Sequence, residues 1–528
     1  MAPFHPPPIL LPMFGRSIDG LGLITWVGGA YLGCAAVTWV VPKVGALWRS
    51  RLDEAGSFHL EAHIKRHGGL LVKIGQFIAS RPDIFPPPYV ERCSMLRDQV
   101  PPRPFPIIKA ALDVAYEGRT AEHLARVDPE PLAAASFGQV HRAWIFDQAA
   151  PGGIGAMVAV KVQYPGLAPS VATDLWHLRL ALRFAALALP GWPLGQIHQE
   201  ITRTSQDEQD YLREGNAAER LREPLLKYGL FVPAVHWAHT REKVLVMQFA
   251  PGTTLARLNI SALGMDERHH LAETVIDGFL EMLLEQGFFH ADPHAGNLMY
   301  DPAVALPDGT RRPARLWLID FGMTGTIDVR QRALYRRFLA CVRRDDTDGM
   351  IDVIMELGVQ LPDADRDSMR ALARQVYDEF SRMDPRAFMG SKRQIEIAGQ
   401  IGAFISRMQG VVLPQHTIML ARATGLIEGV CMELVPGTNV LELARPRLGK
   451  VISPFAEAKR MLSEMREMWR GLRRLPEQIA SLRQPAPRQG PLIWGILLIA
   501  ALQLDHGVWR DTAAIVAAGG LLLSLIRR

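Results

Sequence analysis

The sequence predicts an α+β protein with two lobes, a small β-sheet lobe over about residues 131–250 and a mainly helical lobe over about residues 251–450. Two β-branched, apolar runs at residues 138–146 and 156–163 predict neighbouring strands, because the Gly- and Pro-rich stretch between them suits a hairpin loop. Further on, apolar residues recur with helical spacing at residues 271–285. This change from strand to helix periodicity predicts the two lobes.

Composition excludes several classes of protein before any motif is considered. Of the 528 residues, 48% are hydrophobic and 21% are charged, which excludes a disordered chain. The net charge is only +5, so no nucleic-acid partner is expected. The cysteines are too far apart for a zinc site or a disulfide framework, and we expect four buried free thiols: Cys34, Cys93, Cys341 and Cys431.

The N-terminal region, residues 1–49, contains an uncharged stretch at residues 20–42. Its 23 residues are enough to cross a hydrocarbon core of ~30 Å at ~1.5 Å per residue. Five glycines and the tryptophans Trp26 and Trp39 are compatible with lipid. The stretch is long enough to span a membrane, and a helix that lies on the protein or on the membrane surface is left open as the alternative.

The C-terminus carries a second apolar signal. Two uncharged runs of 15 residues, 490–504 and 512–526, are separated by a polar turn and predict a membrane helical hairpin within residues 490–528. Before it, residues 451–489 predict a basic amphipathic helix and a linker, because residues 443–490 hold eleven Lys or Arg and four Asp or Glu. A solvated helix and an apolar helix pair packed on the protein core are the alternatives.

A lysine embedded in the second predicted strand, Lys161, is the first candidate functional residue. A charge inside an apolar strand costs free energy unless it is used. A small-residue turn precedes the first strand and comprises Ala133, Ala134, Ala135, Ser136, Phe137, Gly138 and Gln139. A turn, a strand, a hairpin and a strand with a lysine form the layout of a nucleotide-binding lobe, in which backbone amides cover phosphates and the lysine pairs with them.

An acidic helix is predicted at residues 196–226. Asp210 and Glu214 are four residues apart and would share one face of it, whereas Glu208 points elsewhere. We expect one of the two glutamates to position Lys161; a solvated acidic face is the alternative.

The most specific pattern lies in the helical lobe. The segment His-Ala-Asp-Pro-His-Ala-Gly-Asn begins at His290, and a later apolar strand ends in Asp-Phe-Gly. Phosphoryl transfer needs oxygens that bind Mg²⁺ and one carboxylate beside the attacking oxygen. Asp292 suits the carboxylate, and Asn297 and Asp320 suit the magnesium ligands. His290 and His294 have no evident third metal ligand, so we expect them to shape the loop.

These motifs resemble those of the UbiB/ADCK family of atypical kinases, which share a two-lobed protein-kinase-like fold. The resemblance covers about residues 60–450. Its most family-specific element is the Lys-x-Gly-Gln signature from Lys73 to Gln76, which ordinary protein kinases lack. The alanine-rich turn, the Glu-x-Asp triplet that begins at Glu208 and a C-terminal segment that includes Arg422 also match. Gly215 is a departure, because the family more often has alanine there.

The resemblance implies roles for these residues. Lys161 would contact the nucleotide phosphates with Glu214 as its partner. Lys73 would belong to a helical extension at residues 50–130 that folds over the peptide-substrate site, with Glu208 as its partner. The predicted catalytic residues are therefore Lys73, Gln76, Lys161, Glu208, Asp210, Glu214 and Asp292. The cofactors implied are ATP or ADP with Mg²⁺. Alanine is stiffer than glycine in the phosphate turn, so we also expect a changed preference between ATP and ADP.

The family's setting is the biosynthesis of ubiquinone or a related isoprenoid quinone at a membrane, and its members resemble ATPases more than efficient protein kinases. The resemblance thus implies a Mg-dependent ATPase whose partners are membrane lipids and quinone-biosynthesis enzymes, at the cytoplasmic face of the inner membrane if the chain is bacterial. A homodimer is left open. The alternatives are a protein kinase that acts in trans, a small-molecule or lipid kinase, and a non-catalytic nucleotide-binding module.

Overall fold

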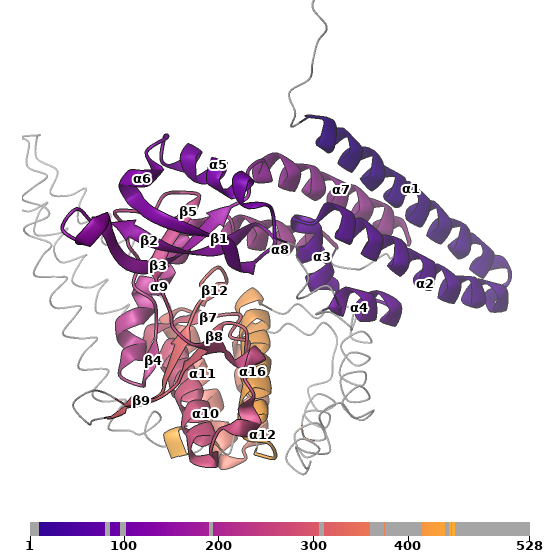
Figure 1. Ribbon diagram of the computed structural model, residues 1–528. Coiled ribbons are helices and arrows are strands. Elements are labelled where there is room, and N and C mark those ends of the chain that lie inside the picture. Colours follow the sequence, from indigo (N-terminus) through magenta and orange to yellow (C-terminus); the bar gives the residue numbers. More distant parts are fainter. Residues whose placement is uncertain are drawn as a thin grey trace, which may run out of the picture. The chain divides into compact units, whose positions relative to one another are not determined.

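The computed structural model covers residues 1–528, and the described residues are 10–79, 85–95, 102–188, 194–305, 311–358, 374, 414–438, 443–444 and 446–448. The chain divides into two compact units, Met1–Lys450 and Val451–Arg528. The second unit, with the predicted amphipathic helix and membrane hairpin, lies outside the described residues, so both remain predictions. Figure 1 labels the elements of the first unit.

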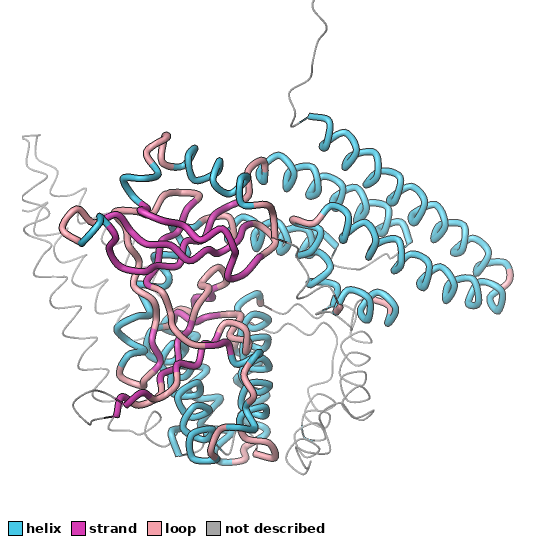
Figure 2. Tube along the Cα trace, in the orientation of Figure 1, coloured by secondary structure: helices cyan, strands magenta, loops and turns pink. Residues whose placement is uncertain are grey.

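An antiparallel four-stranded sheet, in the order β1-β2-β3-β5, forms the first lobe (Figure 2). Its strands are β1 (Leu124–Ala134), β2 (Gly138–Phe146), β3 (Ile154–Gln163) and β5 (Val244–Gln248). Strands β2 and β3 confirm the two predicted runs. The expected turn at residues 133–139 is shorter than predicted, because β1 extends to Ala134 and β2 begins at Gly138. Two prolines, Pro129 and Pro131, and several register shifts hide the strand pattern of β1.

The alternation of side chains in β3 determines where Lys161 points. Val158, Val160 and Val162 are fully buried and pack in one cluster with α5 (Phe105–Ala115). Because successive side chains of a strand point to opposite faces, Lys161 lies on the other face of the sheet. Burying the valines against α5 therefore presents the lysine to the elements on the opposite side.

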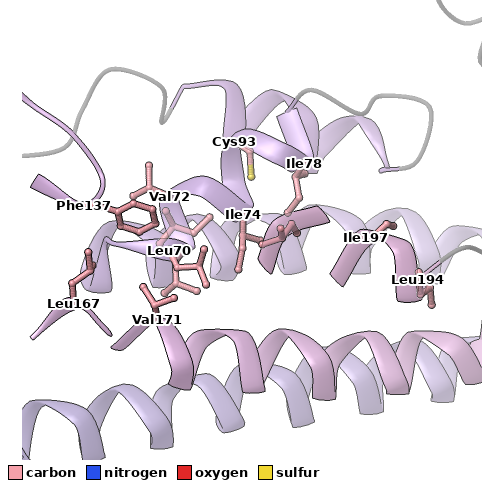
Figure 3. Packing of buried hydrophobic residues seen from close by; sticks show 13 residues of the cluster. Leu70, Val72, Ile74, Ile78, Cys93, Phe137, Leu167, Val171, Leu194 and Ile197 are labelled. Atoms are coloured by element: carbon pink, nitrogen blue, oxygen red, sulfur yellow. The ribbon is translucent and has the colours of Figure 1, made fainter. Parts of the chain in front are cut away.

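Helices precede the sheet and also follow β3. They are α1 (Leu10–Val40), α2 (Pro42–His67), α3 (Leu70–Ala79), α4 (Pro87–Ser94), α6 (Thr120–His123), α7 (Leu167–Ala188) and α8 (Leu194–Asp207). Helices α3, α7 and α8 share a hydrophobic cluster that also takes in Phe137 of the β1–β2 turn (Figure 3). The labelled members of this cluster are Leu70, Val72, Ile74, Ile78, Cys93, Phe137, Leu167, Val171, Leu194 and Ile197. The turn is thus anchored to the helical extension.

The acidic helix predicted at residues 196–226 is in fact two helices, α8 and α9 (Tyr211–Leu226). Asp210 is the N-cap of α9, and its carboxylate accepts a hydrogen bond of 2.9 Å from the backbone N–H of Arg213. The expectation that Asp210 and Glu214 share a helix face is therefore wrong, because Asp210 precedes the helix. Aspartate favours this position since it satisfies a free N–H at the start of the helix.

The second lobe combines helices with short strands. The helices are α10 (Met265–Leu280), which continues into a π-helical turn (Glu281–Gln286), α11 (Val329–Arg344), α12 (Thr347–Glu356) and α16 (Gln415–Leu434). One sheet has the order β4-β11-β8-β6, and separate pairs are β7 with β12 and β9 with β10. The strands are β4 (Leu230–Phe231), β6 (Thr253–Thr254), β7 (Phe288–His290), β8 (Leu298–Asp301), β9 (Val304–Ala305), β10 (Arg311–Arg312), β11 (Arg315–Leu318) and β12 (Thr324–Thr326). The helix predicted at residues 271–285 is confirmed.

One helix among the described residues is long and apolar enough to cross a membrane, at Gly15–Trp39 within α1. The uncharged stretch at residues 20–42 does not match its limits, because α1 ends at Val40 and Pro42 starts α2. Proline is tolerated in the first turn of a helix, where its missing N–H has no partner in any case.

Candidate nucleotide site

Side chains from two other elements meet at Lys161. Its ammonium group donates hydrogen bonds of 2.7 and 2.9 Å to the two carboxylate oxygens of Glu214, from α9, and one of 3.2 Å to Oδ1 of Asp320, which follows β11. The ammonium also lies 5.3 Å from the centre of the Tyr211 ring, a contact that the sequence did not suggest. The predicted pairing of Lys161 with Glu214 is confirmed.

Burial and charge oppose one another in this cluster. Burial disfavours the charge on Lys161, but Asp320 and Glu214 together hold its pKa well above the ordinary value. Burial alone would raise the pKa of Asp320, yet Lys161 and the backbone N–H of Gly322 hold it far below the ordinary value. For Glu214, whose side chain is 1% exposed, burial outweighs Lys161 and raises the pKa to about 7. The arrangement fixes a cation and the Asp320 anion within one hydrogen bond of each other.

His290 shapes the loop as predicted. Its ring is fully buried, and its Nδ1 accepts a hydrogen bond of 3.1 Å from the backbone N–H of Asp292. Nε2 therefore carries the proton and donates to the backbone carbonyl of Asp320 at 2.7 Å. Asp320 has a φ of +59°, in the left-handed region that is unusual for a non-glycine residue. The two hydrogen bonds of His290 thus tie the Asp292 loop to the backbone that holds Asp320.

Asp292 and Asn297 lie at the two ends of that loop. The Nδ2 amide group of Asn297 donates a hydrogen bond of 3.0 Å to the backbone carbonyl of Asp292. This leaves Oδ1 of Asn297 as the acceptor that a cation needs. His294 has a local role as well, since its Nδ1 accepts a hydrogen bond of 2.9 Å from the backbone N–H of Gly296.

Arg422, on α16, was not among the predicted site residues. Its Nη2 donates a hydrogen bond of 2.8 Å to Oδ1 of Asp292. Burial would raise the pKa of Asp292, but Arg422 and the nearby His294 hold it below the ordinary value. Only the resemblance of the segment around Arg422 to the family's C-terminal segment pointed to this part of the chain.

The Lys-x-Gly-Gln signature lies beside the same site. Lys73, on α3, forms an ion pair of 2.8 Å with Glu208, which confirms the predicted pairing. Lys73 also lies near enough to Asp292 and Asp320 to help lower the pKa of each carboxyl. Gln76 follows three residues later on α3 and is half-buried. Asp210, the α9 cap, is positioned to hold the start of the helix that carries Glu214.

The predicted phosphate-binding turn divides into exposed and buried parts. Ala133 and Ala135 are exposed and Ala134 is half-buried, so their backbone is available to a ligand. The side chains of Phe137 and Gln139 are buried, so these two residues can meet a ligand only through their backbone. Phe137 is 3% exposed and packs in the hydrophobic cluster with α3, α7 and α8. The Gln139 amide group is fully buried, where its oxygen accepts from the Arg103 backbone N–H at 2.9 Å.

The remaining turn residues present little side-chain surface. Ser136 is 6% exposed. Gly138 is closely surrounded, because a Cβ added there would lie 2.3 Å from the backbone oxygen of Val162. Any contact that these two residues make with a ligand must therefore come from the peptide groups, as expected for a turn that covers phosphates.

The donor set suits a magnesium ion that arrives with a nucleotide. Oδ1 of Asp320 accepts the hydrogen bonds from Lys161 and Gly322, whereas Oδ2 accepts none from the described residues. The Asp320 side chain is 47% exposed. Within the described ranges, no group of three or more His, Cys, Asp or Glu side chains is arranged to hold a metal ion. One carboxylate and one amide oxygen, from Asp320 and Asn297, fit Mg²⁺ that keeps water and phosphate ligands.

Gly215 has a packing reason. A Cβ added at this buried position of α9 would lie 2.9 Å from Cη2 of Trp237, so the indole ring fills the space that alanine would use. Glycine at this position, where the family more often has alanine, therefore leaves room for the indole ring of Trp237.

Comparison with known proteins decides the family. Residues 95–354 match the family described as ABC1 atypical kinase-like domain. Over 303 residues the chain is 30% identical to the uncharacterized protein slr0889 of Synechocystis, an alignment that covers 55% of this chain and 70% of that protein. The chain belongs to the ABC1 family of atypical kinases. This membership confirms the resemblance found in the sequence and a kinase-like fold with mixed helix and sheet.

Two further similarities involve a plant protein and a solved structure. The chain is 28% identical over 446 residues to protein ACTIVITY OF BC1 COMPLEX KINASE 8, chloroplastic, of Arabidopsis thaliana, which covers 78% of this chain. The same alignment covers 56% of the plant protein, so the chain spans little more than half of that relative. A structure of Rv3197 with erythromycin from Mycobacterium tuberculosis is similar with a TM-score of 0.48 and 20% identity, over 75% of this chain and 96% of that chain.

Proposed function

We propose that this protein is a membrane-associated, Mg-dependent ATPase that supports the biosynthesis of an isoprenoid quinone by making lipid precursors accessible to other enzymes. The observation that carries the phosphoryl-transfer part is the meeting of Lys161, Glu214 and Asp320 at hydrogen-bond distance, next to the loop that carries Asp292 and Asn297. These residues are a lysine for the phosphates, oxygen ligands for Mg²⁺ and a carboxylate for the attacking group, which are the side-chain types that phosphoryl transfer uses.

Each residue has a defined task in this proposal. Lys161, oriented by Glu214, pairs with the phosphate oxygens, and Asp320 with Asn297 holds the magnesium ion. When bound, Mg²⁺ neutralises the charge that develops on the transferring phosphoryl group. Asp292 lies at the head of the loop, where its carboxylate accepts the proton of the attacking hydroxyl group or water. The hydrogen bonds of His290 hold the loop against the backbone of Asp320.

The position of the Lys-x-Gly-Gln helix favours an ATPase over a kinase that acts on proteins in trans. Lys73 of α3 pairs with Glu208 and lies close to both Asp292 and Asp320. The helical extension therefore occupies space beside the residue that would receive a peptide hydroxyl. A water molecule needs far less room than a peptide, so this geometry supports hydrolysis.

Membrane association is supported by the apolar helix Gly15–Trp39 and by the basic and apolar C-terminal sequence. Two parts of the proposal rest on the family resemblance: that the protein acts on lipid precursors, and that the product pathway is the biosynthesis of an isoprenoid quinone. The purified full-length protein should hydrolyse ATP with Mg²⁺, and vesicles that contain anionic lipid should raise the rate. Turnover that stays at zero with and without vesicles would refute the ATPase proposal. The client is tested by quinone and precursor profiles of cells that lack the protein, rescued with wild type or with Asp292→Asn.

Arg422→Gln is expected to raise the rate of ATP hydrolysis, because it removes the ion pair that occupies Oδ1 of Asp292. The Arg422 side chain is 44% exposed, so solvent screening limits the ion pair to about 1 kcal/mol and the rise to roughly fivefold. Steady-state kinetics would measure it, with Arg337→Gln as a control for the loss of an exposed arginine ion pair elsewhere. An unchanged or lower rate for Arg422→Gln alone would show that the contact positions Asp292 instead.

Ala134→Gly is expected to change the ratio of the ATP and ADP dissociation constants. Among the described residues, the non-glycine residues with positive φ are Glu117, Asp320 and Asp345, so the alanine turn has ordinary backbone angles. Glycine allows the amides to turn, and one gained or lost hydrogen bond of about 0.5–1.5 kcal/mol alters affinity roughly two- to tenfold. Titration with both nucleotides measures the ratio, and Ala150→Gly in the other hairpin is the control. Equal ratios in wild type and Ala134→Gly would contradict the role of the turn.

A further inference from the structure

Helices α1 and α2 form a helical hairpin with a tight tip. Helix α1 ends at Val40 and α2 begins at Pro42, and the two helices then pack along one another (Figure 1). Near the turn between them, the buried Cys34 thiol donates to the backbone carbonyl of Gly45 at 3.4 Å. A Cβ added to Gly45 would lie 2.1 Å from Oγ1 of Thr38, so only glycine permits this approach.

The opposite end of this hairpin is held by buried charges. Arg16 of α1 forms a two-point ion pair with Asp174 of α7, whose side chain is 1% exposed, and donates to the backbone carbonyl of His67 at 2.9 Å. His67 also lies 3.0 Å from the carboxylate of Asp19. If α1 left this position to cross a membrane by itself, Asp174 would remain buried without its partner. The contacts therefore favour an α1 that stays with α2 and α7.

The tip, defined as residues 38–51, exposes several large apolar side chains close together in the sequence. Trp39 is 90% exposed, Leu47 58% and Trp48 48%, and Val41 and Val44 are exposed as well. Five large apolar side chains thus lie exposed within ten residues of the chain. Exposed large apolar side chains gathered in this way mark a site of interaction.

Charge identifies the partner. The sequence from residue 20 to residue 52 contains no Asp or Glu, and Lys43, Arg49 and Arg51 are exposed on the tip. Basic side chains near exposed tryptophans fit the interface of an anionic bilayer, where indole rings settle at the level of the headgroups and cations meet lipid phosphates.

We propose that the tip of the α1–α2 hairpin inserts into one leaflet of an anionic membrane, while the other end of the hairpin stays attached to the protein through Arg16 and Asp174. This inference rests on the proposed membrane association and specifies how it occurs: α1 enters the membrane together with α2 and does not cross it. Trp39 and Trp48 are the anchors, and Lys43, Arg49 and Arg51 supply the attraction to anionic headgroups.

The test measures the depth of the tip directly, because the C-terminal unit can also bind lipid. A polarity-sensitive fluorophore is attached to Leu47→Cys in the full-length protein; the four native cysteines are buried. With anionic vesicles we expect a shift of its emission to shorter wavelength and quenching by lipids that carry spin labels at a shallow depth. The matched control is Val114→Cys on α5, 78% exposed, whose label should not respond.

Substitutions then test which side chains hold the tip. Trp39→Glu with Trp48→Glu should abolish the response of the Leu47→Cys label, whereas Trp176→Glu, at a 54% exposed tryptophan of α7, should leave it unchanged. Neutralising each of Lys43, Arg49 and Arg51 should reduce that response at sub-saturating anionic lipid roughly fivefold per charge. Unaltered thermal melting and ATP hydrolysis without vesicles verify that the variants fold.

Each outcome has one meaning. Wild-type protein that binds vesicles while the Leu47→Cys label stays in water overturns the hairpin proposal and leaves membrane association intact. Quenching by spin labels at the bilayer centre and in the far leaflet shows a crossing α1 and also overturns it. Loss of self-association, with no change at vesicles, in the double tryptophan variant assigns the tip to a protein interface. Wild type that binds no vesicles refutes membrane association itself.

Discussion

Asp320→Asn should lower the rate of Mg-dependent ATP hydrolysis by roughly 10²- to 10³-fold, the size of loss seen when one electrostatic group of a transition state is removed. Asparagine keeps the size of the side chain and, like aspartate, tolerates the left-handed backbone at φ +59°. The variant removes the negative charge that faces Lys161 and that Mg²⁺ would require. Hydrolysis rates measured over a range of Mg²⁺ concentrations are the readout.

A matched control for this substitution exists in the same lobe. Asp345 also has a positive φ, of 55°, at the end of α11, so Asp345→Asn makes the same chemical change in the same backbone conformation. It should fold and hydrolyse ATP like wild type. Turnover of Asp320→Asn at the wild-type rate would show that this carboxylate holds no metal, and the proposed site would have to be abandoned.

Lys161→Met should both abolish hydrolysis and destabilise the protein. The change leaves Glu214, 1% exposed, buried without its cation, and breaking a buried ion pair in this way costs about 3–5 kcal/mol. Chemical denaturation with urea measures the free energy of unfolding, and nucleotide titration measures the loss of binding. The loss of activity and the loss of stability have different causes, which a second variant can separate.

That second variant is Lys161→Met with Glu214→Met. With both charges gone, apolar side chains of similar length fill the buried space, so most of the lost stability should return. Hydrolysis should not return, because no cation pairs with the phosphates. If stability and hydrolysis were recovered together, Lys161 would be a structural residue and the assignment of the site would fail.

Local patterns were sufficient to predict the parts of the site that depend on one element or on neighbouring elements. The alternation of β3 buries three valines and so places Lys161 on the face where a charge is useful. The acidic segment was recognised, but its division into two helices was not, because aspartate is common both within an exposed helix face and at an N-cap. Only the backbone around Asp210 distinguishes these positions.

Contacts between distant parts of the chain could not be predicted from spacing. Arg422 reaches Asp292 across 130 residues of sequence, and no periodicity records such a pairing. For the same reason the burial of Phe137 and Gln139 was missed. The turn looked like an exposed loop of small residues, whereas helices that come from both before and after it in the sequence cover its far side.

The packing of Phe137 has a mechanical consequence. Its ring is clamped among residues of α3, α7 and α8, and the same turn carries the amides that would meet a nucleotide. Close-packed side chains transmit a displacement with little loss, so a shift of the turn cannot remain local. Binding or loss of a nucleotide phosphate at this turn would therefore also shift α3, α7 and α8, although these helices do not contact the phosphate themselves.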